Sequence, residues 1–470
     1  MPSTQAFPAV KECDIRGRCP GEVDEALFSR VARNFGTAIC STRFGGLRDG
    51  TVVLGGDGRS STAALRRTIA DGLLERGAAV TELPGAVPTP VVYWAKRRLR
   101  AQACAIVTAS HSPPDWNGLK VMNGPLPPLP AEILALVAPP DETREPRCAG
   151  THSRAATILD EYLREQSSTF ARRGITGLSV VVDPGGGCQA GVATRLLRAV
   201  GARVTAIHDA LDGTFADRHP DCAVPEHLHA LAAAVRRHRA DVGIAFDGDG
   251  DRLAVVDDLG RVASAEQVAM LLLQGPVPVP AGGTVILDVK SSMHVEELVR
   301  RTGGVPIRCR SGHAFMKRAV ITGRAVLGAE VTGHLFLGAL EGIDDPLHTA
   351  LLLCEWRAGS GQPLSASLDA LPRLSVSPDV RIRMSADGVA ALVDACPTRF
   401  HGCEIDRTDG VRLVWPEGWL LVRRSVTEEA CTLRFEGREP ADLGRVVRRF
   451  VDAFPDLRDA VPAALARRGH

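Results

Sequence analysis

Hydrophobic runs typical of β-strands recur three times along the chain, each in the same context. They lie at residues 51–56, 178–187 and 283–289. Each run is followed by a helical stretch that ends at a glycine, and then by a second short apolar run. The pattern predicts three strand–helix–strand units, whose strands pair in parallel because a helix crosses over between them.

Each unit then reaches a later apolar strand that ends in a polar loop. We expect these later strands at residues 103–107, 242–246 and 325–327. The three loops that follow carry different side chains. Because ligands of open α/β sheets bind beyond the carboxyl ends of the strands, three equivalent loops with three chemistries predict one site assembled between three related domains.

The pattern changes at two further places, which divide the chain. Residues 138–155 are rich in proline, charge and small polar side chains and are expected to be a linker. After about residue 371 the pattern becomes strands with a closing helix, which indicates a different module. We therefore expect four domains, at residues 1–150, 151–260, 261–370 and 371–470.

The composition excludes several classes of protein. The chain has 470 residues, with 56 basic and 55 acidic side chains and a formal net charge of +1, so no polyanion-binding surface and no nucleic-acid partner is expected. No apolar run has membrane-spanning length, and residues 1–10 do not form an apolar signal core. The 12 cysteines lack zinc-binding spacing. We expect a cytoplasmic protein with reduced thiols, without a membrane partner, as a monomer or dimer.

A serine loop follows the first of the later strands. Ser110 is flanked by His111, and Lys120 comes ten residues after Ser110. A hydroxyl with a base beside it is a candidate covalent nucleophile. The alternative is structural, because Ser110 or Ser112 followed by prolines is also typical of a helix start.

A triple-aspartate loop follows the second of the later strands. Asp247, Asp249 and Asp251 alternate with glycines, and three carboxylates this close require a counter-cation such as Mg²⁺ or Ca²⁺. A calcium loop of the EF-hand type is excluded, because Arg252 and Asp258 stand where that loop needs glycine and glutamate. A solvated acidic turn remains the alternative.

Four motifs, in order, give the chain a resemblance to the α-D-phosphohexomutases over nearly its whole length. Residues 108–120 resemble the phosphoserine loop, 247–252 the metal loop, 330–334 the sugar-binding loop, and 409–412 with 422–427 the phosphate-binding strand and loop. Residues 13–17, Lys290 and residues 310–313 also fit. Glu330 with Thr332 is closest to the bacterial phosphomannomutase/phosphoglucomutase branch.

The resemblance implies a fold and an activity. The expected fold class is α/β, with three related mixed-sheet α/β domains plus a fourth α+β domain around a central cleft. The implied enzyme is an isomerase of carbohydrate metabolism that transfers a phosphoryl group reversibly between the 1- and 6-positions of a hexose phosphate, mannose and/or glucose. It does so through a phosphoserine and a bisphosphate intermediate. The implied cofactors are Mg²⁺, phosphorylated Ser110 and a hexose 1,6-bisphosphate activator, and the partner is a small-molecule phosphosugar.

The resemblance also assigns roles to residues. The catalytic residues are Ser110 as phosphocarrier, Lys120, His111 and Arg16. Lys120 is the candidate general base and acid, with a pKa that nearby cations are expected to lower. The metal ligands are Asp247, Asp249, Asp251 and Ser110. The substrate-binding residues are Arg252, Lys290, His313, Glu330, Thr332, His334, Arg423, Ser425 and Thr427. Alternatively, Glu330 is an ordinary surface acid and His334 a packed loop histidine.

The chain departs from the family pattern at a few positions. Ser112 replaces an asparagine and Cys13 an aromatic residue, while Val426 and Glu429 replace an asparagine and a proline in the phosphate loop. The changed phosphate loop keeps three other functions open. These are a mutase of a modified sugar or cyclitol phosphate, a sugar-phosphate phosphatase, and a non-catalytic phosphosugar-binding protein.

Overall fold

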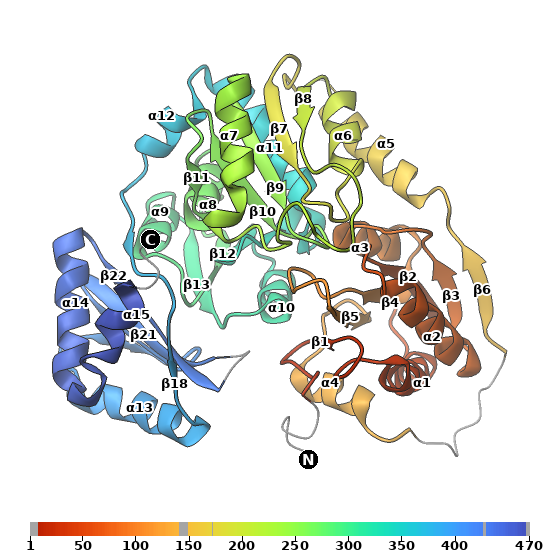
Figure 1. Cartoon of the computed structure of the whole chain (residues 1–470), viewed down its shortest axis with the longest axis horizontal. Helices are drawn as coiled ribbons and strands as arrows, with labels where there is room; N and C mark the ends of the chain where they lie inside the picture. Colours follow the sequence, from red (N-terminus) through yellow and green to blue (C-terminus); the bar gives the residue numbers. More distant parts are fainter. Residues whose placement is uncertain (1–7, 141–148, 172, 426–428, 467–470) are drawn as a thin grey trace.

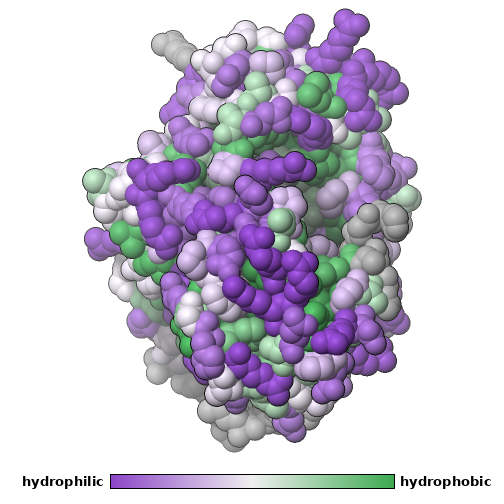
Figure 2. All heavy atoms as spheres, turned by 90° about the vertical axis from the view of Figure 1, so that its left-hand side faces the viewer, coloured by the Kyte–Doolittle hydropathy of each residue, from purple (hydrophilic) through white to green (hydrophobic). Residues whose placement is uncertain are grey.

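A computed structural model describes residues 8–140, 149–171, 173–425 and 429–466. Four sheets with their helices follow one another along the chain and are arranged as an arc (Figure 1). None of the helices in these ranges is both long and apolar enough to cross a membrane. The face on the left of Figure 1 carries mainly hydrophilic side chains, with hydrophobic ones visible only in patches between them (Figure 2).

The first sheet has six strands in the order β1-β5-β4-β2-β3-β6. Its strands are β1 (Ile15–Arg18), β2 (Arg48–Gly56), β3 (Ala79–Glu82), β4 (Ala101–Val107), β5 (Trp116–Asn123) and β6 (Thr151–Arg154). The helices of this region are α1 (Glu25–Ser41), α2 (Thr62–Glu75), α3 (Thr89–Arg98) and α4 (Pro130–Val137).

The second and third sheets have five strands each, in the orders β11-β10-β9-β7-β8 and β13-β12-β14-β15-β16. The second comprises β7 (Ser179–Asp183), β8 (Arg203–Ala206), β9 (Val242–Phe246), β10 (Leu253–Asp257) and β11 (Val262–Ala263), with α5 (Ile158–Phe170), α6 (Val192–Ala199), the 3-10 helix η2 (Pro225–Leu228) and α7 (His229–His238). The third comprises β12 (Thr284–Asp288), β13 (Val305–Cys309), β14 (Leu327–Ala329), β15 (Leu335–Leu337) and β16 (Ile343–Asp344), with α8 (Ala265–Gln274), α9 (Met293–Arg301), α10 (His313–Gly323), η3 (Gly338–Leu340), α11 (Pro346–Ser360) and α12 (Leu364–Asp369).

The predicted repeat is confirmed by the pairing of the strands. The central strands β2, β7 and β12 each pair in parallel with two neighbours. The later strands β4, β9 and β14 then pair with an antiparallel strand on their other side. The three sheets are therefore mixed and share one topology, and the polar loops that follow the later strands occupy equivalent positions.

Two local expectations were wrong. The strand expected at residues 325–327 begins at Leu327, because Arg324 ends α10 with a left-handed φ of 47° and the Ala325 N–H still bonds back to Val320. Residues 138–155 are not wholly a linker, because β6 pairs in parallel with β3 and extends the first sheet. This strand reads Thr-His-Ser-Arg and is exposed along its length, so no apolar residue marks it in the sequence pattern.

The fourth sheet is entirely antiparallel, and with its helices it confirms the expected α+β module. Its strands are β17 (Ser375–Val376), β18 (Val380–Arg383), β19 (Glu404–Asp406), β20 (Val411–Trp415), β21 (Gly418–Arg424) and β22 (Ala430–Gly437). The helices are α13 (Ala386–Arg399), α14 (Pro440–Ala453), η4 (Pro455–Leu457) and α15 (Ala460–Ala466).

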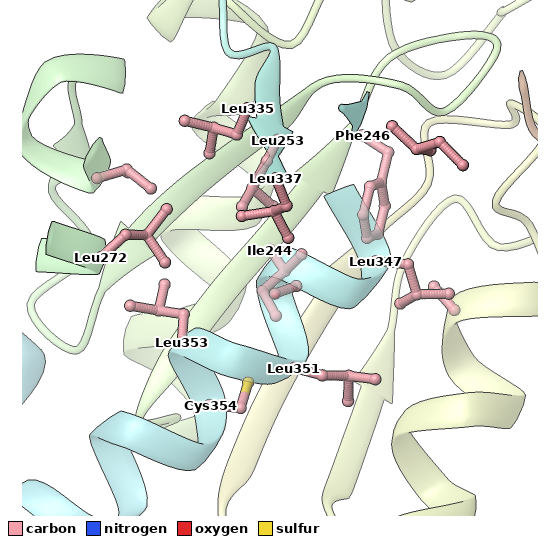
Figure 3. Packing of buried hydrophobic residues seen from close by; sticks show 14 of the residues in the cluster. Ile244, Phe246, Leu253, Leu272, Leu335, Leu337, Leu347, Leu351, Leu353 and Cys354 are labelled. Atoms are coloured by element: carbon pink, nitrogen blue, oxygen red, sulfur yellow. The ribbon is translucent and has the colours of Figure 1, made fainter. Parts of the chain in front are cut away.

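Helix α11 joins the second and third sheets into one hydrophobic core. Its Leu347 and Leu351 are fully buried and lie among side chains of β9, β10 and β15, including Phe246 and Leu337 (Figure 3). The same cluster includes buried residues of β4 and α3 from the first region. Since burial of apolar area is the main stabilising term, the first three α/β units form one packed body.

The fourth module has its own core and contacts the third unit through a small buried interface that is partly apolar and partly polar. Trp419 and Leu421 pack against Val289 and Met293. The fully buried Arg412 donates to the carbonyl of Ser291 at 3.1 Å and lies over the ring of Trp419. These contacts fix where the phosphate-binding strand β21 stands relative to the rest.

We predict that Leu351→Ala lowers the stability of this shared core by about 2–5 kcal/mol, because the lost methyl groups leave a cavity. The measurement is urea unfolding followed by circular dichroism. Leu259→Ala is the matched control, since Leu259 is 55 % exposed and its truncation should change little. Equal midpoints for the two variants would contradict the role given to α11.

Candidate active site

Ser110 stands on a strained loop directly after β4. Its φ is 51°, in the left-handed region that costs free energy for a residue other than glycine. The hydroxyl is buried, donates to Asp247 Oδ2 at 2.8 Å and lies 3.2 Å from His111 Nδ1. Glycine at 118 holds the loop close to its neighbours, since a Cβ there would overlap the carbonyl oxygens of Ile15 and Thr108. Residues 110–115 form turns and no helix, so Ser110 does not cap a helix.

The three aspartates lie on the turn between β9 and β10, with their carboxylate oxygens within 4.8 Å of one another. Asp247 Oδ1 accepts the backbone N–H groups of Asp251 and Arg252, which holds the turn together. Among the described residues, one buried oxygen of Asp249 and one of Asp251 have no hydrogen-bond partner. Burial and the two neighbouring carboxylates raise the pKa of Asp247 to about 7. A set of buried oxygens with unused lone pairs fits a hard divalent cation.

Lys120 reaches the aspartates from the neighbouring sheet. It lies on β5, and its Nζ is 2.7 Å from Asp249 and 2.6 Å from Asp251. Burial lowers the pKa of Lys120, but these two ion pairs outweigh burial and hold the pKa above its ordinary value. The expectation that nearby cations lower this pKa was therefore wrong, because the charges of Asp249 and Asp251 act on Lys120 more strongly than that of Arg16.

The charges that act most strongly on His111 are positive, whereas those that act most strongly on Lys120 are negative. Burial, together with the positive charges of Arg252 and Arg16, holds the pKa of His111 well below its usual range. The ring is therefore neutral, and its unprotonated nitrogen can accept a hydrogen bond. Arg16 lies on β1 beside the cleft, where it pairs with Asp14 at 2.6 Å, and its buried Nε has no partner among the described residues.

A chain of buried polar contacts runs from the metal loop into the third sheet. Arg252 Nε donates to His334 Nε2 at 3.1 Å, and His334 Nδ1 lies 3.1 Å from Asp344. Asp344 also contacts His313 Nε2 at 2.8 Å and Lys317 at 3.2 Å. His334 is thus buried and makes polar contacts on both ring nitrogens, which connect Arg252 of the metal loop to Asp344.

Asp344 was missed by the sequence reasoning. Its context, Asp-Asp-Pro, is a helix-start signal, and Asp345 does cap α11 by accepting the His348 N–H at 3.0 Å. The signal therefore points to the wrong aspartate. Only the packing of β16 against β15 turns Asp344 inward, where it is fully buried among two histidines and a lysine.

The loop between β14 and β15 presents polar atoms with no protein partner. Glu330 is largely buried, and its Oε2 and the hydroxyl of Thr332 have no hydrogen-bond partner among the described residues. A buried acceptor without a partner is costly and marks a place where a ligand donates. Glu330 is therefore not an ordinary surface acid.

The fourth module contributes cations and hydroxyls. Arg423 pairs with Asp409 at 2.9 Å, its Nε has no partner among the described residues, and Ser425 is buried beside it. Lys290 from the third sheet lies 3.5 Å from Asp379. Glu429 is exposed, so its charge lies outside the buried part of the site. Thr427 and Val426 lie outside the described residues.

These side chains line one cleft with a volume of about 400 Å³. Eleven of the predicted residues line it, namely Arg16, Ser110, His111, Lys120, Arg252, Lys290, His313, Glu330, His334, Arg423 and Ser425. The three aspartates are not among its lining residues, but they contact Ser110 and Lys120, which are. Thr332 does not line it either. The cleft is also lined by Asp14, Tyr93, Asp379, Arg381 and Thr432, which the sequence reasoning did not select.

Comparisons with known proteins agree with this geometry. Three family models match in order: phosphoglucomutase/phosphomannomutase alpha/beta/alpha domain I at residues 8–138, domain II at 160–260 and domain III at 266–374. A phosphomannomutase/phosphoglucomutase of Pseudomonas aeruginosa is 31% identical over 452 residues, which cover 96% of each chain. A phosphoglucomutase of Neisseria gonorrhoeae is 32% identical, covering 86% of this chain and 89% of its own.

A solved structure extends the likeness to three dimensions. The crystal structure of a phosphoglucomutase/phosphomannomutase family protein from Burkholderia thailandensis has a TM-score of 0.85 and 32% identity, and the match covers 98% of this chain and 99% of that one. The likeness thus includes the fourth module as well as the three repeats. The chain belongs to the α-D-phosphohexomutase superfamily of isomerases, in its bacterial phosphomannomutase/phosphoglucomutase branch.

Proposed function

We propose that this enzyme interconverts the 1-phosphate and the 6-phosphate of a hexose, mannose and/or glucose, through a phosphorylated Ser110. The observation that carries the proposal is the position of the Ser110 hydroxyl. It lies 2.8 Å from a buried carboxylate of the metal loop and beside a neutral histidine, on the wall of a cleft lined by cations. A buried nucleophile with a neighbouring base and a clustered carboxylate site is the arrangement that phosphoryl transfer needs.

The aspartates Asp247, Asp249 and Asp251, with the serine oxygen, are the proposed ligands of Mg²⁺. Mg²⁺ held by these carboxylates would offset their charge and that of the transferred phosphoryl group, and this would weaken the effect that holds the pKa of Lys120 above its ordinary value. Arg16 and Arg252, which line the same cleft as Ser110, supply fixed positive charge for the phosphoryl oxygens.

In the first half-reaction, the bond between phosphorus and the serine oxygen breaks and a bond to a sugar hydroxyl oxygen forms. The proton of that hydroxyl must leave, and Lys120 is the proposed acceptor, assisted by His111. The product is a hexose 1,6-bisphosphate, and Ser110 is free. The second half-reaction runs in reverse with the other phosphate, so the protein ends as it began, and the organic phosphate is conserved.

The far side of the cleft is proposed to hold the phosphate that does not react. Arg423 and Ser425 provide a guanidinium and a hydroxyl there, and Thr427 is assigned to the same clamp. Glu330 and Thr332 carry oxygens that have no hydrogen-bond partner among the described residues, and these are proposed to bind the sugar hydroxyls. Lys290, His313 and His334 line the same cleft as Glu330 and are assigned to the same substrate. Since each phosphate must occupy both ends in turn, the bisphosphate has to turn around within the cleft.

The proposal is tested by phosphorus NMR with Mg²⁺, a trace of glucose 1,6-bisphosphate, and mannose 1-phosphate or glucose 1-phosphate. A mutase converts the 1-phosphate signal to a 6-phosphate signal without free phosphate. Free phosphate would identify a sugar-phosphate phosphatase instead. No change with either sugar would contradict the hexose assignment and favour a modified sugar or cyclitol phosphate, or a binding protein.

We predict that Ser110→Ala lowers kcat by at least about 10³-fold, because Ser110 is the proposed carrier of the phosphoryl group. Ser112→Ala is the matched control two residues away and should keep most of the activity. The readout is the NMR assay, with circular dichroism to verify the fold. Turnover by the Ser110→Ala enzyme at near the wild-type rate would remove Ser110 from the mechanism.

We predict that Glu330→Gln lowers kcat/KM by about 10- to 100-fold, the loss expected for one or two hydrogen bonds to a charged acceptor. The exposed Glu226 offers a control, because Glu226→Gln changes the same charge away from the cleft. Steady-state kinetics with both sugars measures the effect. Unchanged kinetics in Glu330→Gln would show that the unpartnered oxygen does not meet the substrate.

We predict that Mg²⁺ binds more tightly at pH 8 than at pH 6, because below about pH 7 a proton on Asp247 competes with the metal. The pKa of this carboxyl is raised above its ordinary value of 3.8, so its contribution to stability is lost as pH rises through about 7. Mg²⁺ should therefore stabilise the protein more at pH 8. Calorimetric titration and thermal unfolding at both pH values measure this, and equal affinities would contradict the buried carboxyl cluster.

A further inference from the structure

A second cavity, larger than the cleft, lies where the first three α/β units meet. Its volume is about 970 Å³, at the upper end of the range for small-molecule sites. Helices α3 and α10, which contact each other through Tyr93 and Lys317, contribute to its wall (Figure 1). Nothing in the proposed mechanism uses this cavity.

The cavity has a marked excess of positive charge. It is lined by six basic residues, Lys96, Arg97, Arg100, Arg173, Lys317 and Arg324, and by one acid, Glu341. Three of the six have carboxylate partners, since Lys317 pairs with Asp344, Arg173 with Glu355, and Arg97 more distantly with Glu341 at 3.7 Å.

The other three cations have no carboxylate partner among the described residues. Lys96 donates to the carbonyl of Gly124 at 2.8 Å, and Arg100 donates to that of Gly46 at 2.9 Å. Arg324, at the end of α10, is exposed, and its side chain makes no hydrogen bond or ion pair with any of the described residues. Burial lowers the pKa of Lys96, and the positive charge of Lys317 lowers it further. An anion in the cavity would relieve this repulsion.

Most of the remainder of the wall is apolar. Val277, Val320, Ile321, Val326 and Leu352 contribute to it, so a ligand that fills the space must bring hydrophobic surface as well as negative charge. Inorganic phosphate alone would leave most of this surface in water. The match is an organic polyanion with an apolar or aromatic body.

The cavity and the catalytic cleft share a wall. Tyr93 and Met122 line both, and Lys317 lies on the cavity side with its Nζ 3.2 Å from the Tyr93 ring centroid. The same ammonium group is 3.2 Å from Asp344, which holds His313 and His334 at the cleft. A ligand that draws Lys317 toward itself therefore weakens a contact that positions two residues of the cleft.

We propose that this cavity is a regulatory site for a small organic polyanion with an apolar or aromatic body, the chemical class of nucleoside phosphates, and that it acts on the cleft through Lys317 and Asp344.

Binding is tested on the full chain by calorimetry with UDP and GDP, in the presence of saturating glucose 1-phosphate so that the cleft is filled. The variant R97Q/R324Q removes two surface charges of the cavity and should raise the Kd by about tenfold or more. The control R237Q/R239Q removes two exposed charges from the end of α7, which precedes β9 in the second unit as α10 precedes β14 in the third. This control should bind like the wild type. Inorganic pyrophosphate should bind more weakly than either nucleotide.

Three results would overturn the site: no nucleotide binding to the wild type, equal affinities in R97Q/R324Q and R237Q/R239Q, or pyrophosphate binding as tight as nucleotide binding. Because R97Q/R324Q and R237Q/R239Q both leave the residues of the cleft unchanged, the comparison between them does not depend on whether the proposed mutase activity is correct.

Regulation is tested by mutase kinetics at fixed Mg²⁺ with added UDP or GDP. The nucleotide should change kcat at saturating substrate, and R97Q/R324Q should abolish that change while R237Q/R239Q keeps it. Purely competitive inhibition would place the nucleotide in the cleft and refute regulation from the cavity. Binding without any kinetic effect would refute the coupling through Lys317 and Asp344.

Discussion

The burial of three carboxylates within a few ångströms of one another is the constraint on which the rest of this structure depends. Asp247, Asp249 and Asp251 are almost completely buried, and such charges are tolerated only when cations or hydrogen-bond donors compensate them. The turn that carries them supplies two backbone N–H groups. The remaining compensation comes from elsewhere, most directly from Lys120 on the first sheet.

This compensation ties the domains to one another. Lys120 and Thr89 reach from the first sheet and its helix α3 to Asp249, while Arg252 reaches from the metal loop to His334 of the third. Contacts of this kind require fixed distances between sheets, and the continuous hydrophobic core around α11 provides that rigidity. The fourth module is attached differently, through the buried Arg412 and Trp419, and closes the cleft from the other side.

The sequence predicted which residue types form the site far better than it predicted the contacts between them. Ser110 and Glu330 lie in short motifs that follow predictable strands, and local pattern alone places each on a loop at a strand end. Asp344 has no such signal, because its neighbour Asp345 accounts for the helix start. The direction in which the pKa of Lys120 is shifted could not be predicted from the sequence either. It depends on which charges lie nearest in space and not on which lie nearest in sequence.

By itself, the sequence determined the three repeated α/β units, the different fourth module, and the residue types that meet at the cleft, because these follow from hydrophobic periodicity and from motifs only a few residues long. Only the tertiary structure decided the pairing of β6 with the first sheet, the inward position of Asp344, and the large basic cavity behind Tyr93. The reason is physical: each of these arises from contacts between segments far apart in the chain, and no local pattern of hydrophobic and polar positions records the distance at which two such segments finally pack.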